Sequence, residues 1–171
     1  MATTYTLISS VTVGSGGAAN IEFTSINADY TDLLLSFSLR TTRSLEKDDP
    51  VVQFNNNGSN YSYRVLLGTG SAATSYSGGT SFIYLGECNG DTSTASTFSN
   101  QTMYIPNYAS SNNKSVSIDS GQENNATAAN SDIIAGLWAN SSAITSIKIY
   151  SAGAHTIKQY STAYLYGISN A

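Results

Sequence analysis

The amino-acid sequence predicts an all-β fold, an antiparallel jelly-roll-like β-sandwich of about ten strands that forms one domain over residues 1–171. Three observations support this prediction. Apolar and polar residues alternate with the period of two that is typical of strands. Segments rich in Gly, Asn and Ser interrupt the alternation at intervals of roughly a dozen residues, the spacing of a sandwich or barrel. No stretch has the periodicity of a three-turn helix, and neither a linker nor an internal repeat divides the chain.

The chain begins with an expected strand over residues 4–13. Its apolar residues are expected on one face, namely Tyr5, Leu7, Val11 and Val13, and Thr4, Thr6, Ser10 and Thr12 on the other. The glycine-rich segment 14–17 then turns the chain into a second strand at residues 21–23. Two strands joined by a short glycine loop predict a hairpin.

A long apolar face over residues 33–39 predicts a central strand. The charge-dense segment 40–49 follows, and we expect it to be a solvated loop tip. Two further strands, at residues 52–54 and 61–67, flank Asn57-Gly58, a strong hairpin signal.

Residues 68–79 are polar and rich in glycine, so we expect a surface loop there. Four more strands are expected after it, at residues 82–86, 98–105, 116–120 and 133–138. The last of these is nearly continuously apolar, which predicts a strand covered on both faces.

The C-terminal stretch, residues 144–168, shows the clearest β pattern and predicts two strands folded against each other as a hairpin. In its second half, residues 160–168, tyrosines alternate with mostly small residues, so this strand has two distinct faces. We expect a strand this aromatic to be covered. The connection carries the sole histidine, His155, which we expect at an exposed tip.

Composition excludes several classes of protein. Charged residues make up 11% of the chain, against a usual share of about a quarter. The net charge is −4 and the seven Lys and Arg are scattered, so there is no basic stripe for nucleic acid. Cys88 is the one cysteine, which excludes an intrachain disulfide and favours a small buried apolar residue. The N-terminus lacks the features of a signal peptide and the apolar runs are far below the ~20 residues of a spanning helix, so we expect folding in a cytoplasm without membrane insertion.

Catalytic chemistry is not predicted. A nucleophilic triad needs a histidine beside a serine or cysteine and an acid, but the one histidine lies in a predicted turn and no G-x-S-x-G motif is present. Glycoside hydrolysis needs two converging carboxylates, and nothing singles out a pair among Asp29, Asp32, Glu87, Asp91, Asp119, Glu123 and Asp132. Oxygen ligands of the kind calcium accepts stand on loops without EF-hand spacing, at Asp48, Asp49, Asn89 and Asp91, and a solvated acidic loop explains them better. We expect no catalytic residue, no cofactor and no metal.

Binding is the stronger expectation, because twelve Tyr, one Trp and many Asn are suited to stacking on sugar rings and hydrogen-bonding to their hydroxyls. The candidate interface or ligand contacts are Tyr61, Tyr63, Tyr76, Tyr108 and Trp138. The alternative is that most strand tyrosines belong to the core or to a subunit interface.

Long phrases of the sequence resemble a family of small structural proteins from tailed bacteriophages, especially viruses of aquatic bacteria and cyanobacteria. The similar stretches cover nearly the whole chain, at residues 4–13, 26–42, 104–149 and 159–171. The most specific phrases are Pro106-Asn107-Tyr108, Gly136-Leu137-Trp138 and Leu165-Tyr166-Gly167-Ile168.

The resemblance implies a virion protein and transfers no catalytic residues, so we do not expect an enzyme. We expect a capsid decoration or cement protein, a homo-oligomer such as a trimer that binds the major capsid protein or other virion proteins on the outer surface of the head. The alternative is a tail-fibre or tailspike-associated module that binds host-surface carbohydrate. In either case the protein is made in the host cytoplasm and resides in the virion.

Overall fold

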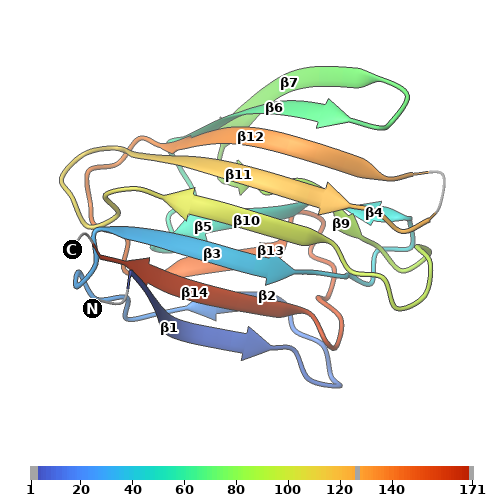
Figure 1. Cartoon of the computed structure of the whole chain (residues 1–171), viewed down its shortest axis with the longest axis horizontal. Coiled ribbons are helices and arrows are strands. Elements are labelled where there is room, and N and C mark those ends of the chain that lie inside the picture. Colours follow the sequence, from blue (N-terminus) through green and yellow to red (C-terminus); the bar gives the residue numbers. More distant parts are fainter. Residues whose placement is uncertain (1–3, 126–127, 170–171) are drawn as a thin grey trace.

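The computed structural model describes residues 4–125 and 128–169, which form fourteen β-strands and no helix (Figure 1). The strands are β1 (Tyr5–Thr12), β2 (Asn20–Phe23), β3 (Asp32–Ser38), β4 (Lys47–Asp48), β5 (Pro50–Phe54), β6 (Tyr61–Gly68), β7 (Ala73–Thr80), β8 (Ile83–Tyr84), β9 (Cys88–Asn89), β10 (Asn100–Ile105), β11 (Lys114–Gln122), β12 (Asn130–Trp138), β13 (Ile147–Ser151) and β14 (Thr162–Ile168). The predicted all-β class is confirmed. The count exceeds the predicted one partly because β4, β8 and β9 have only two residues each.

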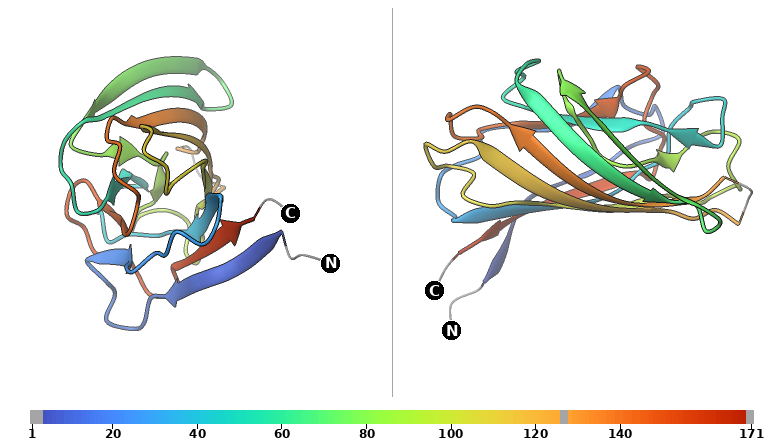
Figure 2. Two further views of the ribbon diagram at one scale, coloured as in Figure 1. Left: turned by 90° about the vertical axis from the view of Figure 1, so that its left-hand side faces the viewer. Right: turned by 90° about the horizontal axis from the view of Figure 1, so that it is seen from above.

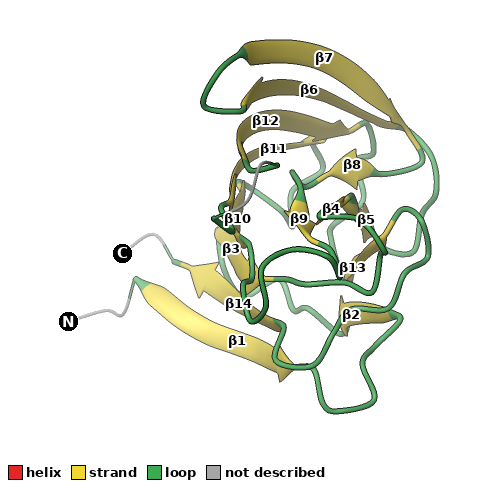
Figure 3. Cartoon of the chain, turned by 90° about the vertical axis from the view of Figure 1, so that its right-hand side faces the viewer, coloured by secondary structure: helices red, strands yellow, loops and turns green. Residues whose placement is uncertain are grey.

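The strands form two facing sheets. One has eight strands in the order β1-β14-β3-β10-β11-β12-β6-β7, and the other has four in the order β2-β13-β5-β8. Seen end-on, the larger sheet curves around the smaller one, and the pair β4-β9 lies between them (Figures 2 and 3). The antiparallel sandwich is therefore present, whereas its jelly-roll connectivity stays a prediction.

Strict alternation on the central strands builds the core. In β3, every second residue is buried while its neighbours are only partly so, as the period-two pattern of residues 33–39 predicts. β3 lies between β14 and β10, which confirms it as a central strand. Ile147 and Ile149 of β13 contribute fully buried side chains from the opposite sheet, and Cys88 is buried as expected.

All three predicted hairpins are wrong. β1 pairs with β14 whereas β2 pairs with β13, so the glycine turn at 14–17 connects the two sheets. Likewise β5 lies in the smaller sheet and β6 in the larger one, and the same separation holds for β13 and β14. Alternation identifies strands, but partners are set by burial of both sheets against one core, and short connections can cross between layers.

The first strand contains a β-bulge that reverses its faces. Leu7 pairs with Tyr166 and Ser9 with Leu165, so Ile8 is the extra residue. Leu7 consequently points to solvent while Val11, four residues later, packs against the core. The uninterrupted alternation predicted for residues 4–13 is wrong for this reason.

Two other expectations about surface and burial are corrected. Most of the predicted loop 68–79 forms the edge strand β7, which pairs with β6 along its full length. Its side chains are mainly exposed, so small polar residues are tolerated on both faces. In β12, Ile133 is 62% exposed, so this strand is covered on one face and not on both.

Candidate functional site

Three of the five predicted contact residues lie in the core. The Trp138 ring stacks on Tyr61 at 6.0 Å between centroids, and Phe54 packs at 5.7 Å from Trp138. The Tyr61 hydroxyl accepts a hydrogen bond from the backbone amide of Phe54 at 2.8 Å. Tyr108 is fully buried and its hydroxyl donates to the backbone carbonyl of Asn27. These rings are packing residues in the folded chain.

The other two predicted contacts, Tyr63 and Tyr76, lie near the open edge formed by β6 and β7. Their ring centroids are 6.0 and 6.2 Å from Tyr84, which is buried between the sheets. Tyr76 keeps 41% of its surface exposed, and partial burial raises its pKa to about 12. Its hydroxyl therefore stays protonated at neutral pH.

A row of large side chains crosses the outer face of the eight-stranded sheet. Leu7, Tyr166, Leu34 and Tyr104 stand directly opposite one another on β1, β14, β3 and β10. Together with Tyr5, we call them the outer apolar patch. Tyr5, Leu7 and Tyr104 are exposed, and the remaining two are partly exposed. The tyrosine face of β14, which we expected to be covered, is thus left open by this chain.

Asp32, a carboxylate at the margin of the outer apolar patch, is already engaged. Asp32 accepts a 2.7 Å hydrogen bond from the Tyr104 hydroxyl and a 2.8 Å bond from the backbone amide of Asn107. The bond to Asp32 raises the pKa of Tyr104. Both groups are held in place, so the patch combines apolar side chains with a fixed polar border.

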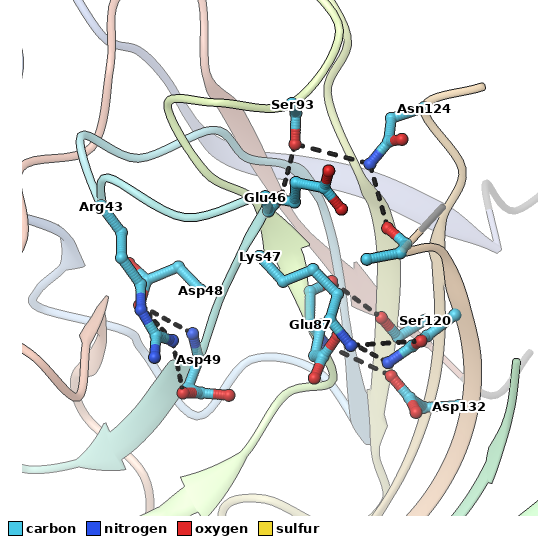
Figure 4. A network of polar contacts seen from close by, with 12 residues as sticks. Arg43, Glu46, Lys47, Asp48, Asp49, Glu87, Ser93, Ser120, Asn124 and Asp132 are labelled. Atoms are coloured by element: carbon cyan, nitrogen blue, oxygen red, sulfur yellow. Dashed lines mark hydrogen bonds and ion pairs between the residues drawn. The ribbon is translucent and has the colours of Figure 1, made fainter. Parts of the chain in front are cut away.

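A polar network fills one end of the space between the sheets (Figure 4). The Lys47 ammonium lies 2.6 Å from the Glu87 carboxylate, which also accepts a 2.5 Å hydrogen bond from Asn130. The backbone amide of Glu87 donates to Asp132 at 3.2 Å, and its carbonyl accepts from Gln101 at 2.9 Å. Four segments of the chain are connected through these contacts.

Glu87 and Asp132 are two of the seven carboxylates considered for glycoside hydrolysis, and they do converge. Burial raises the pKa of both, and the Lys47 ammonium opposes the rise. Asp132 is 1% exposed, so a sugar cannot reach it, and the neighbouring groove of about 500 Å³ is bordered by the paired Arg43 and Asp49. This geometry fits a structural network better than a pair of catalytic carboxylates.

The sole histidine does meet a serine and an acid, contrary to the expected exposed tip. His155 Nδ1 lies 3.1 Å from Ser151 Oγ and 3.3 Å from Asp48 Oδ2, and the side chain of Asp48 is 1% exposed. Both contacts use the same ring nitrogen. A catalytic triad places the acid on one nitrogen and the nucleophile on the other, so this arrangement does not activate Ser151.

The charge-dense segment 40–49 is not the predicted solvated tip. Arg40 is 6% exposed and its guanidinium donates to carbonyl oxygens of Thr94 at 2.8 Å and Ser93 at 2.9 Å. It also donates to the carbonyls of Thr97 and Asp91, at 3.0 and 3.2 Å. One buried cation thus holds the loop between β9 and β10.

Three of the four residues considered as calcium ligands are engaged in ion pairs. Arg43 lies 3.5 Å from Asp48 and 2.9 Å from Asp49, and Lys158 forms an ion pair with Asp91. The side-chain nitrogen of Asn89 donates to Thr97 at 2.5 Å, whereas its side-chain oxygen is buried without a hydrogen-bond partner. In the described part of the chain, no three His, Cys, Asp or Glu side chains are grouped as a metal site.

Comparisons with known proteins found no counterpart. No family model matches the chain, and neither a curated protein nor a solved structure matches it. Within residues 4–125 and 128–169 there is no helix with the length and apolarity required to cross a membrane.

Proposed function

We propose that the chain is a structural protein of a bacteriophage virion, and that the outer apolar patch is its protein-binding surface. The most economical form of this proposal is a capsid decoration protein that assembles as a homotrimer and binds the major capsid protein. The observation that carries it is the open row Leu7, Tyr166, Leu34 and Tyr104, whose side chains cross four adjacent strands.

The size of the patch supports a protein partner. Tyr5, Leu7 and Tyr104 are 54%, 52% and 38% exposed. At roughly 200 Å² for each large side chain, they leave roughly 290 Å² in contact with solvent before Leu34 and Tyr166 are added. A standard interface buries about 800 Å² per partner, somewhat more than half of it apolar. The patch therefore supplies most of the apolar part of one interface.

The chemistry around the patch supports the same role. Beyond Tyr104 the row continues with the small residues Ser117 and Ala135, and the border carboxylate Asp32 accepts two hydrogen bonds. A partner would bury few unpaired charges, whose desolvation is the main cost at an interface. Closed symmetry is the usual way for copies of one chain to cover such a face.

The proposal is tested with purified protein and with phage capsids from which decoration proteins have been stripped. Wild-type chain is expected to form a closed oligomer in analytical ultracentrifugation and to sediment with the capsids. Leu7→Asp places a charge in the patch and is expected to abolish one or both interactions.

The matched control is Leu66→Asp, which alters a 52% exposed leucine on β6, far from the patch along the same sheet. This variant should behave as wild type. A wild-type chain that stays monomeric and does not bind capsids contradicts the proposal, as does an equal effect of the two substitutions.

A further inference from the structure

A second surface feature lies away from the outer apolar patch, where the loop after β9 meets the turn before β14. A pocket of about 460 Å³ opens there, lined chiefly by Asp91, Ser96 and Phe98 from the loop and by Lys158, Gln159 and Tyr160 from the turn. Both segments approach the same end of the larger sheet, at the right in Figure 1.

Tyr160 occupies a backbone conformation that a bulky residue avoids. The amide of Ser161 donates to the carbonyl of Lys158 at 3.2 Å and closes a four-residue turn, with Tyr160 at its third position and φ at 71°. Turns with positive φ at this position favour glycine. The sequence pattern had placed Tyr160 inside the last strand, which instead begins at Thr162.

The strained turn presents the aromatic ring to solvent. The Tyr160 amide donates to the carbonyl of Val13 at 3.0 Å, so its backbone is fixed, while the residue is 69% exposed. Among described non-glycine residues with positive φ, it is the only aromatic one. Strained residues that persist at surface sites point to a function of the side chain.

The loop after β9, which lines the pocket opposite the Tyr160 turn, is also held in a fixed conformation. Arg40 holds the loop through four backbone carbonyls, and Ser96 at the rim has a second positive φ, 61°. Asp91 and Lys158 join loop and turn through their ion pair. The pocket is therefore formed before any ligand arrives, which lowers the entropic cost of binding.

The charges of the pocket indicate the class of ligand. The Arg40 guanidinium is buried and donates to the loop carbonyls, and the charge of the Lys158 ammonium is balanced by Asp91, so neither cation offers an unpaired charge to an anion such as phosphate. An exposed aromatic face beside amide, carboxylate and ammonium groups matches a neutral molecule with one apolar face and several hydroxyls.

We propose that this pocket binds a neutral pyranose unit of a glycan. The Tyr160 ring stacks on the apolar face of the sugar, and Asp91, Lys158 and Gln159 form hydrogen bonds with its hydroxyls. The site is independent of the proposed capsid contact, because it shares no residue with the outer apolar patch.

The test uses the full chain and four methyl pyranosides, with gluco, galacto, manno and N-acetylglucosamine configurations. Saturation-transfer NMR and calorimetric titration should show saturable binding of at least one of them. Tyr160→Gly should weaken that binding at least tenfold. Because glycine suits the turn, the melting temperature of this variant should not fall, which separates lost binding from lost folding.

The matched control is Tyr164→Ala, which removes a 37% exposed tyrosine of β14 outside both the pocket and the patch. It should bind the sugar as wild type does. The inference is overturned if none of the four pyranosides shows saturable binding, or if the Tyr160→Gly variant binds the sugar as tightly as wild type. It is also overturned if inorganic phosphate or a sulfated pyranoside binds more tightly than every neutral pyranoside. Leu7→Asp, which tests the capsid contact, should leave sugar binding intact.

Discussion

Replacement of Arg40 by methionine tests whether one buried cation maintains the loop between β9 and β10. Methionine keeps much of the aliphatic stem and removes the guanidinium, so the carbonyls of Asp91, Ser93, Thr94 and Thr97 lose their shared donor. The chain should still fold, because Arg40 lies beyond the end of β3 and outside the apolar core.

The expected cost follows from the exposure of each acceptor. Hydrogen bonds to charged groups contribute about 1.5–3 kcal/mol each, and an unsatisfied buried carbonyl costs about 1–3 kcal/mol. Ser93 is 5% exposed and bears the full penalty, whereas Thr94 and Asp91 are exposed and water can replace the guanidinium there. We therefore expect Arg40→Met to lower the free energy of unfolding by about 3–5 kcal/mol, within the range for breaking buried ionic networks.

Equilibrium unfolding in urea measures this loss, which corresponds to a midpoint shift of roughly 2 M for a typical slope. Arg64→Met is the matched control, because Arg64 is exposed and donates only to the neighbouring Tyr63 carbonyl, at 3.0 Å, among the contacts described. Its effect should stay below about 0.5 kcal/mol. A loss of unfolding free energy below about 1 kcal/mol for Arg40→Met would refute the role of Arg40 in holding the loop between β9 and β10. It would mean that the loop carbonyls are satisfied without the guanidinium.

Three further variants test other parts of the structure. Tyr160→Gly should raise the free energy of unfolding by about 1 kcal/mol in urea titrations, because glycine relieves the positive φ, and a decrease would contradict the strain. Asp132→Asn should flatten the pH dependence of stability. Burial raises the folded pKa of Asp132 above its unfolded value, so its stabilising contribution is present below about pH 4 and is lost as pH rises through the folded pKa. Urea midpoints at acidic and neutral pH should therefore differ less in the variant than in wild type. Trp138→Ala empties a site stacked on Tyr61 and should cost about 3–5 kcal/mol by the same assay.

The sequence predicted where most strands lie because a strand that is buried on one face needs alternating apolar and polar residues. β3 was located from alternation and β10 from the apolar and aromatic residues that precede Pro106, and the structure places the apolar side chains of one face of each strand in the core. Strand partners leave no such trace, since either sheet accepts the same alternation. The hairpin expected across residues 144–168 is wrong for this reason. The alternation expected over residues 4–13 is wrong because the bulge at Ile8 inserts one residue, which reverses every face after it.

The candidate sites were less predictable than the strands. Buried aromatic and exposed aromatic residues look alike in sequence, so Tyr61, Tyr108 and Trp138 were grouped with Tyr76 although their burial differs. Tyr160 gave no signal, because its turn lacks the glycine that usually marks positive φ. Arg40 was also missed, because a charged residue next to other charges is usually solvated.

The pairing of β1 with β14 has a consequence for the order in which the protein folds. Residues 5–12 find their hydrogen-bonding partner only at residues 162–168, and β14 also lies beside β3. As the chain leaves the ribosome, the N-terminal strand must wait until some 150 further residues have been synthesised, and one flank of β3 until some 120 have. Contacts of such long sequence separation slow folding, and until they form, Ile8 and Val11, which pack against the core in the folded chain, stay open to chaperones and to premature association.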